Sequence, residues 1–542
     1  MIDAPLTAVS FAPLAVALPI FGAALAFILR RHKRSQRLVT IGVLVITLAL
    51  ESWMLSIVWG GSTYSVTLGG WAPPFGISMV VDGFSAFMLV VSTIVSLAVL
   101  LYATSQGMAD GDEDGPVSIF HPAYLILVAG VSNAFLAGDL FNLYVGFEIL
   151  LTASYVLLTL GGTNARIRAG TTYVVVSVAS SLLFLIAIAM IYAAAGTVNM
   201  ADLAVKLPQI SEGTQMVLHV MLLVAFGIKA AVFPLSFWLP DSYPTAPAPV
   251  TAVFAGLLTK VGVYAIIRTE TLLFPGNQLQ TLLMVVAGLT MLVGILGAVA
   301  QTDIKRMLSF TLTSHIGFLI FGVSLGNQLG MAATIYYVAH HIVVQTSLFL
   351  VVGLIERRGG TSNIDRLGSL AKISPVLALL FFIPAMNLGG IPPFSGFLGK
   401  LGLVQGGAEV GTPLAWVLIG VSLLTSLLTL LAVARVWNRA FWRRAEDATD
   451  PDPLLLVGVN AARGATYDIV ADEPGSRYSD RGNTALLPNG MVGMTAVLVL
   501  VGLALTIFAG PLFDFSDRAA AQIIDNNHYI EAVLGSTTEV QR

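Results

Sequence analysis

Residues 387–398 read Asn-Leu-Gly-Gly-Ile-Pro-Pro-Phe-Ser-Gly-Phe-Leu, within a long apolar run, and this stretch decides which folds the chain can adopt. The two glycines and two prolines within residues 389–393 do not fit an uninterrupted helix, because proline lacks the amide proton and glycine is conformationally free. Residues 229–239, Lys-Ala-Ala-Val-Phe-Pro-Leu-Ser-Phe-Trp-Leu, form a similar break earlier in the chain. Backbone groups freed at membrane depth survive only inside protein or beside a water-filled cavity. The two breaks therefore predict a membrane protein with a polar interior.

The apolar runs around these breaks have the length of membrane spans. Of 542 residues, 56% are hydrophobic and 11% are charged, and the mean hydropathy is +0.86. Runs of about 18 residues recur, long enough as helices to cross a hydrocarbon core of about 30 Å. They are continuously apolar and do not alternate, which favours helices over a barrel. We expect an all-α polytopic membrane protein with about 14 transmembrane helices.

The two breaks also predict an internal repeat. About five helices separate them, and an odd number gives the copies opposite orientations, as in inverted repeats around a transport path. The expected organisation comprises N-terminal helices one to three (1–115), a first repeat of helices four to eight (116–270), a second of helices nine to thirteen (271–442), a polar cytoplasmic loop (443–487), helix fourteen (488–513) and an external polar tail (514–542).

Basic residues indicate how the chain is oriented. They gather after the first, fifth, ninth, eleventh and thirteenth expected helices, at 30–37, 166–168, 305–306, 357–372 and 435–444. All five sites lie on one side, which the positive-inside rule assigns to the cytoplasm. We therefore expect a multi-pass protein of a bacterial cell membrane with both termini outside.

Composition excludes several kinds of chemistry. The sequence has no cysteine, so it cannot hold a disulfide or a cysteine-ligated iron–sulfur cluster. It has neither a phosphate-binding G-x-x-x-x-G-K-[ST] loop nor a dinucleotide-binding G-x-G-x-x-G turn. A net charge of −3 gives no electrostatic case for nucleic acid. We expect no cofactor and an ion gradient or a partner subunit as the energy source. The sodium site is left unassigned, because no helix carries a cluster of carboxylates.

Isolated charges in apolar helices are the candidate functional residues. Three of only seven lysines, Lys229, Lys260 and Lys400, lie in or beside apolar helices, and Glu148 is equally isolated. A charge at mid-bilayer costs roughly 3 kcal/mol, so each must be paired, hydrated or neutral. Burial favours a neutral lysine and a nearby carboxylate favours the ammonium ion, so such a lysine can load and release a proton. We expect Glu148 and Lys229 to form a switchable pair that passes protons to Lys260.

Three histidines could extend this relay towards Lys400. His315, His340 and His341 lie in apolar surroundings, and imidazole exchanges protons near neutral pH. Asp139, Asp241 and Glu270 lie near helix ends, where we expect structural roles with a second candidate role at an ion mouth.

Structural interpretations stand beside each of these assignments. The Glu148–Lys229 pair could simply pin two helices together, Lys400 could cap carbonyls freed at the break, and the histidines could be hydrogen-bonded residues of the core.

Several motifs together resemble a known family. They are residues 138–148 (Gly-Asp-Leu-Phe-Asn-Leu-Tyr-Val-Gly-Phe-Glu), residues 229–249, Thr259-Lys260, residues 313–317 (Thr-Ser-His-Ile-Gly), His340-His341 and residues 389–397 (Gly-Gly-Ile-Pro-Pro-Phe-Ser-Gly-Phe). Over about residues 80 to 440 the chain resembles the antiporter-like subunits shared by Mrp antiporters and respiratory complex I. It is most similar to the D-subunit branch of the Mrp-type sodium/proton antiporters.

The resemblance implies 14 helices, with helices seven and twelve discontinuous, and a proton relay. Glu148 matches the family's helix-five glutamate, and Lys229, Lys260 and Lys400 match its lysines on helices seven, eight and twelve. Many complex I relatives carry a further lysine on helix eleven, where residues 344–349 read Val-Gln-Thr-Ser-Leu-Phe. This departure favours the Mrp branch and makes a relay on helix eleven depend on His340 and His341.

Three functional hypotheses follow. The first is a proton-translocating subunit of a multisubunit sodium/proton antiporter, with other membrane subunits as partners, Na⁺ and H⁺ as cargo and lipid around it. The second is a proton-pumping subunit of a complex I-type oxidoreductase or a membrane-bound hydrogenase. The third is an assembly scaffold that transports nothing.

Overall fold

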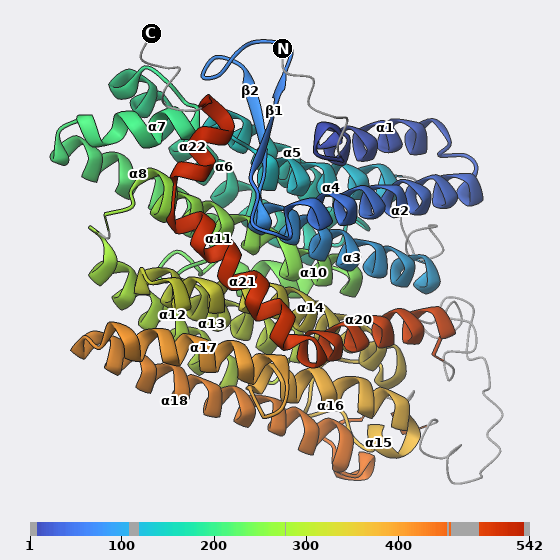
Figure 1. Cartoon of the computed structure of the whole chain (residues 1–542). Coiled ribbons are helices and arrows are strands. Elements are labelled where there is room, and N and C mark those ends of the chain that lie inside the picture. Colours follow the sequence, from blue (N-terminus) through green and yellow to red (C-terminus); the bar gives the residue numbers. More distant parts are fainter. Residues whose placement is uncertain (1–7, 108–118, 277, 452–454, 457–486, 536–542) are drawn as a thin grey trace.

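The computed structural model describes residues 8–107, 119–276, 278–451, 455–456 and 487–535 (Figure 1). Within these ranges, twelve helices are long and apolar enough to cross a membrane. Two shorter apolar helices, α4 (Phe120–Leu136) and α16 (Pro375–Gly389), occupy the other two expected positions. The polytopic α-helical membrane fold is thus confirmed, while the count of fourteen spans stays a prediction.

The N-terminal part contains helices and one feature that hydropathy does not predict, a β-hairpin. Its elements are η1 (Ala8–Phe11), α1 (Leu14–Ile28), α2 (Lys33–Val58), β1 (Tyr64–Leu68), β2 (Ile77–Val81) and α3 (Gly83–Gln106). The strands pair antiparallel from Tyr64 opposite Val81 to Leu68 opposite Ile77. Five-residue strands are too short for a window of membrane length, which is why the sequence prediction omits them.

The next part contains the first helix break. Its elements are α5 (Leu140–Thr159), α6 (Asn164–Ala195), α7 (Met200–Lys206), η4 (Leu207–Gln209), α8 (Glu212–Ala230), α9 (Leu239–Ser242), η5 (Tyr243–Thr245), α10 (Ala248–Val253), η6 (Phe254–Leu258), α11 (Thr259–Arg268) and η7 (Thr269–Leu273). From α10 to η7 the chain forms one buried span that contains two π-helical turns, η6 and η7.

The second break lies in the following part. Its elements are α12 (Gln280–Val299), α13 (Ile304–Leu325), α14 (Gln328–Gly359), α15 (Leu370–Ile373), α16, α17 (Ser395–Val410), α18 (Pro413–Val436), η8 (Trp437–Trp442) and η9 (Ala445–Asp447). Helix α14 is the central element, because it packs on α3, α10, α13, α16, α17, α20 and α21. Its polar side chains therefore face protein and not lipid.

The C-terminal part departs from the expected polar tail. It comprises α20 (Asn489–Ile507), α21 (Ala509–Ile524) and α22 (Asn527–Leu534). Helix α21, in red in Figure 1, crosses the molecule diagonally and packs on α14 and α3, while α22 reaches β1 and α7. Phe515, Ala519 and Ile523 are buried at four-residue spacing, an amphipathic pattern that a hydropathy average hides. Most of the expected 443–487 loop lies outside the described residues.

Two matching isolated β-bridges favour the expected internal repeat. Asp139, which caps α5, forms an isolated β-bridge with Asn199, and Asp303, which caps α13, forms one with Asn363. The two pairs have the same spacing in the sequence. The inverted repeat and its domain boundaries stay predictions.

Candidate functional site

Lys229 lies at the first helix break. Helix α8 ends at Ala230, and Ala231 adopts a left-handed conformation with φ of 59°. Pro234 cannot donate to the carbonyl of Ala230, so the helix cannot continue through it. Lys229 is 7% exposed. Its Nζ donates to Ser181 Oγ of α6 at 3.0 Å and lies 4.7 Å from the centre of the Phe147 ring.

Glu148 is an electrostatic neighbour of Lys229 but does not contact it. The charge of Glu148 acts on the Lys229 amine, yet no ion pair within 4 Å joins them among the described residues. Glu148 Oε1 is buried and has no hydrogen-bond partner in that part of the chain. The expected direct pair is therefore absent from this structure. For the same reason, a Glu148–Lys229 ion pair does not hold α5 against α8 in this structure.

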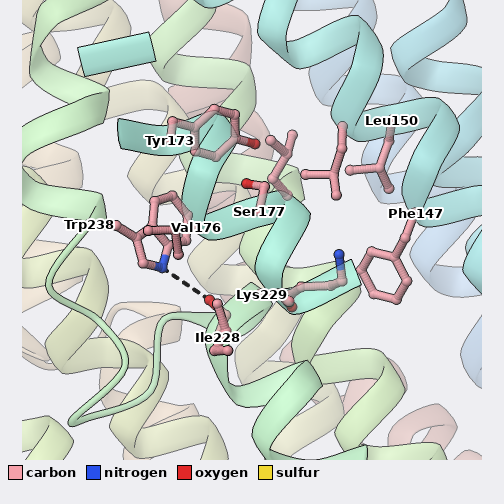
Figure 2. A pocket seen from close by; sticks show the side chains of 11 residues that line it. Phe147, Leu150, Tyr173, Val176, Ser177, Ile228, Lys229 and Trp238 are labelled. Atoms are coloured by element: carbon pink, nitrogen blue, oxygen red, sulfur yellow. Dashed lines mark hydrogen bonds between the residues drawn. The ribbon is translucent and has the colours of Figure 1, made fainter. Parts of the chain in front are cut away.

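A small cavity lies beside Lys229. Figure 2 shows the amine pointing towards Phe147, with Tyr173 and Ser177 on the far wall and Trp238 donating to the carbonyl of Ile228 at 3.1 Å. The cavity has a volume of about 20 Å³. A water molecule needs about 10–15 Å³ and two or more polar partners, so this space can hold one water molecule next to the amine.

Lys260 follows Lys229 in the interior. It is fully buried on α11, and its Nζ donates to the carbonyl of Ala255 in the π-helical turn η6 at 2.6 Å. Such turns free a carbonyl and often lie at functional sites. A Cβ atom on Gly262 would lie 2.6 Å from the amide nitrogen of Ala230. The two lysine-bearing helices therefore meet backbone to backbone, close to both amines.

Two histidines and two aromatic rings lie beyond Lys260. The imidazoles of His315 on α13 and His341 on α14 stack with ring centres 5.2 Å apart. His315 Nδ1 shares a hydrogen bond of 2.6 Å with the hydroxyl group of Tyr337. Lys260 is near enough for its charge to act on both histidines. The Phe318 ring completes this part of the cluster, 5.4 Å from His315.

The second break joins this cluster. His340 Nδ1 shares a hydrogen bond of 2.9 Å with Ser395 Oγ, at the first residue of α17. Lys400 Nζ donates to the carbonyls of Leu388 and Gly389 at 3.0 and 3.4 Å. Lys400 therefore caps the end of α16, as one of its two interpretations expects.

The imidazoles keep free nitrogen atoms. In the described part of the chain, Nε2 of His315, Nε2 of His340 and both ring nitrogens of His341 are buried without a hydrogen-bond partner. A histidine with a structural role only would be expected to use its hydrogen-bonding capacity when buried. The unused nitrogens leave these three side chains able to accept a proton.

Two of the candidate mouth residues, Asp139 and Asp241, lie apart from the buried lysines and histidines. Asp139 caps α5 by accepting from the amide of Asn142 at 2.7 Å, and burial raises the pKa of its carboxyl group to about 6. Asp241 is exposed and pairs with Arg306 at 2.8 Å. That pair lines a cavity of about 300 Å³ that also touches Pro234 at the first break. The cavity thus reaches from an exposed ion pair to the discontinuity beside Lys229.

Sequence reasoning missed several buried polar groups. Glu51 on α2 is fully buried, and so is His219 on α8, which pairs at 2.5 Å with Glu270, a residue expected only at a helix end. Arg268 pairs with Asp82, a contact that joins α11 to the start of α3. Glu51 could have been predicted as an isolated charge, because it is the one carboxylate between Lys33 and Val58. The two pairs join distant segments and leave no local pattern.

A further missed residue is Tyr337, whose role depends on lateral packing. Its ring stacks on His340 with centres 5.1 Å apart, in addition to the His315 hydrogen bond. Tyrosine in an apolar helix is an ordinary core residue, so the sequence offers no signal for this contact.

Comparison with known proteins identifies the family. A family model described as NADH:quinone oxidoreductase/Mrp antiporter, TM, matches residues 137–429. The chain is 39% identical to the D subunit of the Na(+)/H(+) antiporter of Alkalihalophilus pseudofirmus over 96% of this chain and 98% of that one. It is 34% identical to the protein of the same name in Bacillus subtilis, over 97% and 99%. A chain of the solved Mrp complex from Dietzia sp. DQ12-45-1b matches with a TM-score of 0.85 and 33% identity, over 97% of this chain and 99% of that one. The chain therefore belongs to the D-subunit family of Mrp-type sodium/proton antiporters.

Proposed function

We propose that this chain carries protons within a multisubunit sodium/proton antiporter of a bacterial cell membrane. It is a secondary ion transporter, and its partners are other membrane subunits of the complex. Protons pass between Lys229, Lys260, the histidine cluster and Lys400, while Glu148 controls the charge of Lys229.

The observation that carries this proposal is the row of buried bases itself. Lys229, Lys260 and Lys400 are each at most 7% exposed, and none has a carboxylate within 4 Å among the described residues. A permanent charge there would be costly, so each amine must alternate between neutral and protonated forms or remain neutral. The histidines between Lys260 and Lys400 supply further proton acceptors.

Water access supports the same path. The cavity beside Lys229 has room for one water molecule, which can bridge an amine and a hydroxyl group. The larger cavity at Asp241 and Arg306 leads towards the same break. We assign Asp241 to the mouth of this path.

The contacts between basic loops support a cytoplasmic position for this mouth. Arg306 pairs with Asp241, Lys305 pairs with Glu356 at 2.7 Å, and Arg166 donates to the carbonyl of Thr245 at 3.4 Å. Loops after different helices therefore meet at one end of the bundle, as the positive-inside orientation requires.

The rival hypothesis of a scaffold is tested by neutralising Glu148 and Lys229 together. In E148Q/K229M, the relay predicts that a tagged chain still co-purifies with the full set of subunits seen by mass spectrometry, while sodium-dependent proton exchange is lost. Loss of partner subunits from this variant would favour a scaffold. Exchange at the wild-type rate would refute the relay.

A further inference from the structure

Glu51 lies at the centre of a second polar site, remote from the lysine row. It is fully buried on α2, where the buried positions include Gln36, Thr40, Thr47 and Glu51 itself, at helical spacing. Helix α2 packs on α1, α3 and α4, so this buried polar stripe faces protein. Helix α2 thus carries a carboxylate into the protein interior, about 10 Å from its end at Val58.

The groups around this carboxylate are neutral oxygen donors. Ser132 Oγ of α4 lies 3.5 Å from Glu51 Oε1, and the hydroxyl group of Thr93 on α3 is within hydrogen-bonding reach. Glu51 Oε2 and Thr47 Oγ1, one helical turn away, are buried without a partner in the described part of the chain. In that part of the chain, Glu51 has no ion-pair partner within 4 Å. Its charge must therefore be neutralised by a proton or by a bound cation.

The geometry of these oxygens suits a cation. A hydroxyl–carboxylate hydrogen bond is normally about 2.5–2.7 Å long, so 3.5 Å between Ser132 and Glu51 is too long for a good one. Ca²⁺ takes oxygen ligands at about 2.3–2.6 Å, and Na⁺ has nearly the same ionic radius, so neighbouring ligands at right angles around either ion lie about 3.4 Å apart. The spacing thus fits two ligands of one ion, and three helices contribute to the shell.

We propose that Glu51, Thr93 and Ser132 bind a monovalent cation, sodium, in exchange for a proton. Sodium enters as the carboxyl O–H bond breaks, the carboxylate becomes a ligand and one proton leaves, so the net charge of the site is unchanged. The choice of sodium rests on the proposed function, whereas the site itself rests on its oxygen shell.

Among the described residues, the other titratable groups of α1, α3 and α4 lie away from this site. Helix α1 carries none, and Tyr102 of α3 donates instead to the carbonyl of Leu350 at 3.0 Å. On α4, Tyr124 donates to the carbonyl of Ser96 at 2.7 Å, and His121 lies about three turns from Ser132. Exchange at this site therefore depends on Glu51 alone.

Helix α4 connects the site to the relay. Ser132 precedes Asn133, whose Nδ2 donates to the carbonyl and the side-chain oxygen of Asn142 on α5 at 3.0 and 3.1 Å. A Cβ atom on Gly130 would lie 2.5 Å from the amide nitrogen of Leu150, so α4 and α5 are in backbone contact next to Glu148. A change of occupancy at Glu51 can therefore shift the helix that carries Glu148.

The test uses the purified whole complex and difference infrared spectroscopy with sodium chloride against choline chloride. Wild type is expected to lose a protonated-carboxyl band and to release protons when sodium is added. E51Q should lack both changes and require at least about tenfold more sodium for exchange. The control E409Q makes the same chemical change at an exposed position of α17 and should behave as wild type. A sodium-sensitive carboxyl band and normal sodium affinity in E51Q would overturn the proposal.

Two further variants keep the test decisive if E51Q fails to assemble. S132A removes one neutral ligand and should weaken sodium affinity, while S132T retains the hydroxyl group and should restore it. Unchanged sodium affinity in S132A would contradict a role for Ser132 as a sodium ligand. Loss of exchange in K229A with normal sodium affinity in E51Q would reject this site and keep the relay. Normal exchange in K229A together with weakened sodium affinity in E51Q would reject the relay and keep the site.

Discussion

Tyr337 and its neighbour Tyr336 allow a matched test of the histidine cluster. Both are fully buried on α14, and each hydroxyl group makes a hydrogen bond to a residue of another helix. Tyr337 shares its bond with His315 Nδ1 at 2.6 Å, while Tyr336 donates to the carbonyl of Leu505 on α20 at 2.9 Å. Replacing either residue by phenylalanine keeps the ring and removes one buried hydrogen bond, which costs about 1–3 kcal/mol of stability.

The two variants should differ in transport. Y337F leaves His315 without its hydroxyl partner, so the imidazole loses both its orientation and a proton-transfer contact. Positioned proton-transfer groups contribute about 10²–10⁴-fold to rate in enzymes, and we expect a loss of at least about tenfold in sodium-dependent proton exchange. Y336F should exchange at nearly the wild-type rate, because its hydroxyl group faces α20.

The assay is the recovery of a pH-dependent fluorescence signal in everted membrane vesicles after sodium addition, normalised to the amount of assembled complex. Thermal melting of the purified complex checks that the two variants are destabilised alike. Equal transport in Y337F and Y336F, at equal complex levels, would refute a proton path through the His315–Tyr337 contact.

Two further variants probe the breaks and the helix contact. K400R retains a cation that can donate to the carbonyls of Leu388 and Gly389, but arginine cannot release its proton. The complex should therefore assemble, while sodium-dependent proton exchange measured in everted vesicles is lost. Normal exchange in K400R would show that Lys400 only caps the end of α16. G262A places a Cβ atom 2.6 Å from the amide nitrogen of Ala230 and should destabilise the complex by about 1–3 kcal/mol, seen as a lower melting temperature. The control is G213A, because Gly213 lies in open space on α8. Equal melting temperatures of the G262A and G213A complexes would contradict the close contact between α8 and α11.

The isolated charges could be predicted from the sequence because lipid penalises them. Lys229, Lys260 and Lys400 all lie in the protein interior, two of them beside the predicted breaks. The breaks were predictable because proline and glycine act on the local backbone. These features depend on one helix at a time.

Contacts between helices could not be predicted in the same way. Lys229 donates to Ser181 and not to Glu148, and this choice depends on how α6 packs against α8. Tyr337 and Ser395 are ordinary residues in the sequence, and only the packing of α13, α14 and α17 brings them to the histidines. Glu51 could have been recognised as a buried carboxylate, but its shell comes from three helices.

The most direct test of the relay is sodium-driven proton movement in proteoliposomes that contain the purified complex with K229A. Lys206 provides the control, because K206A makes the same change on a lysine that pairs with Asp202 near the surface, at 2.9 Å. We predict that K206A exchanges sodium for protons as wild type does, and that K229A retains every subunit but moves no protons. Proton movement in K229A at the wild-type rate would contradict the central claim.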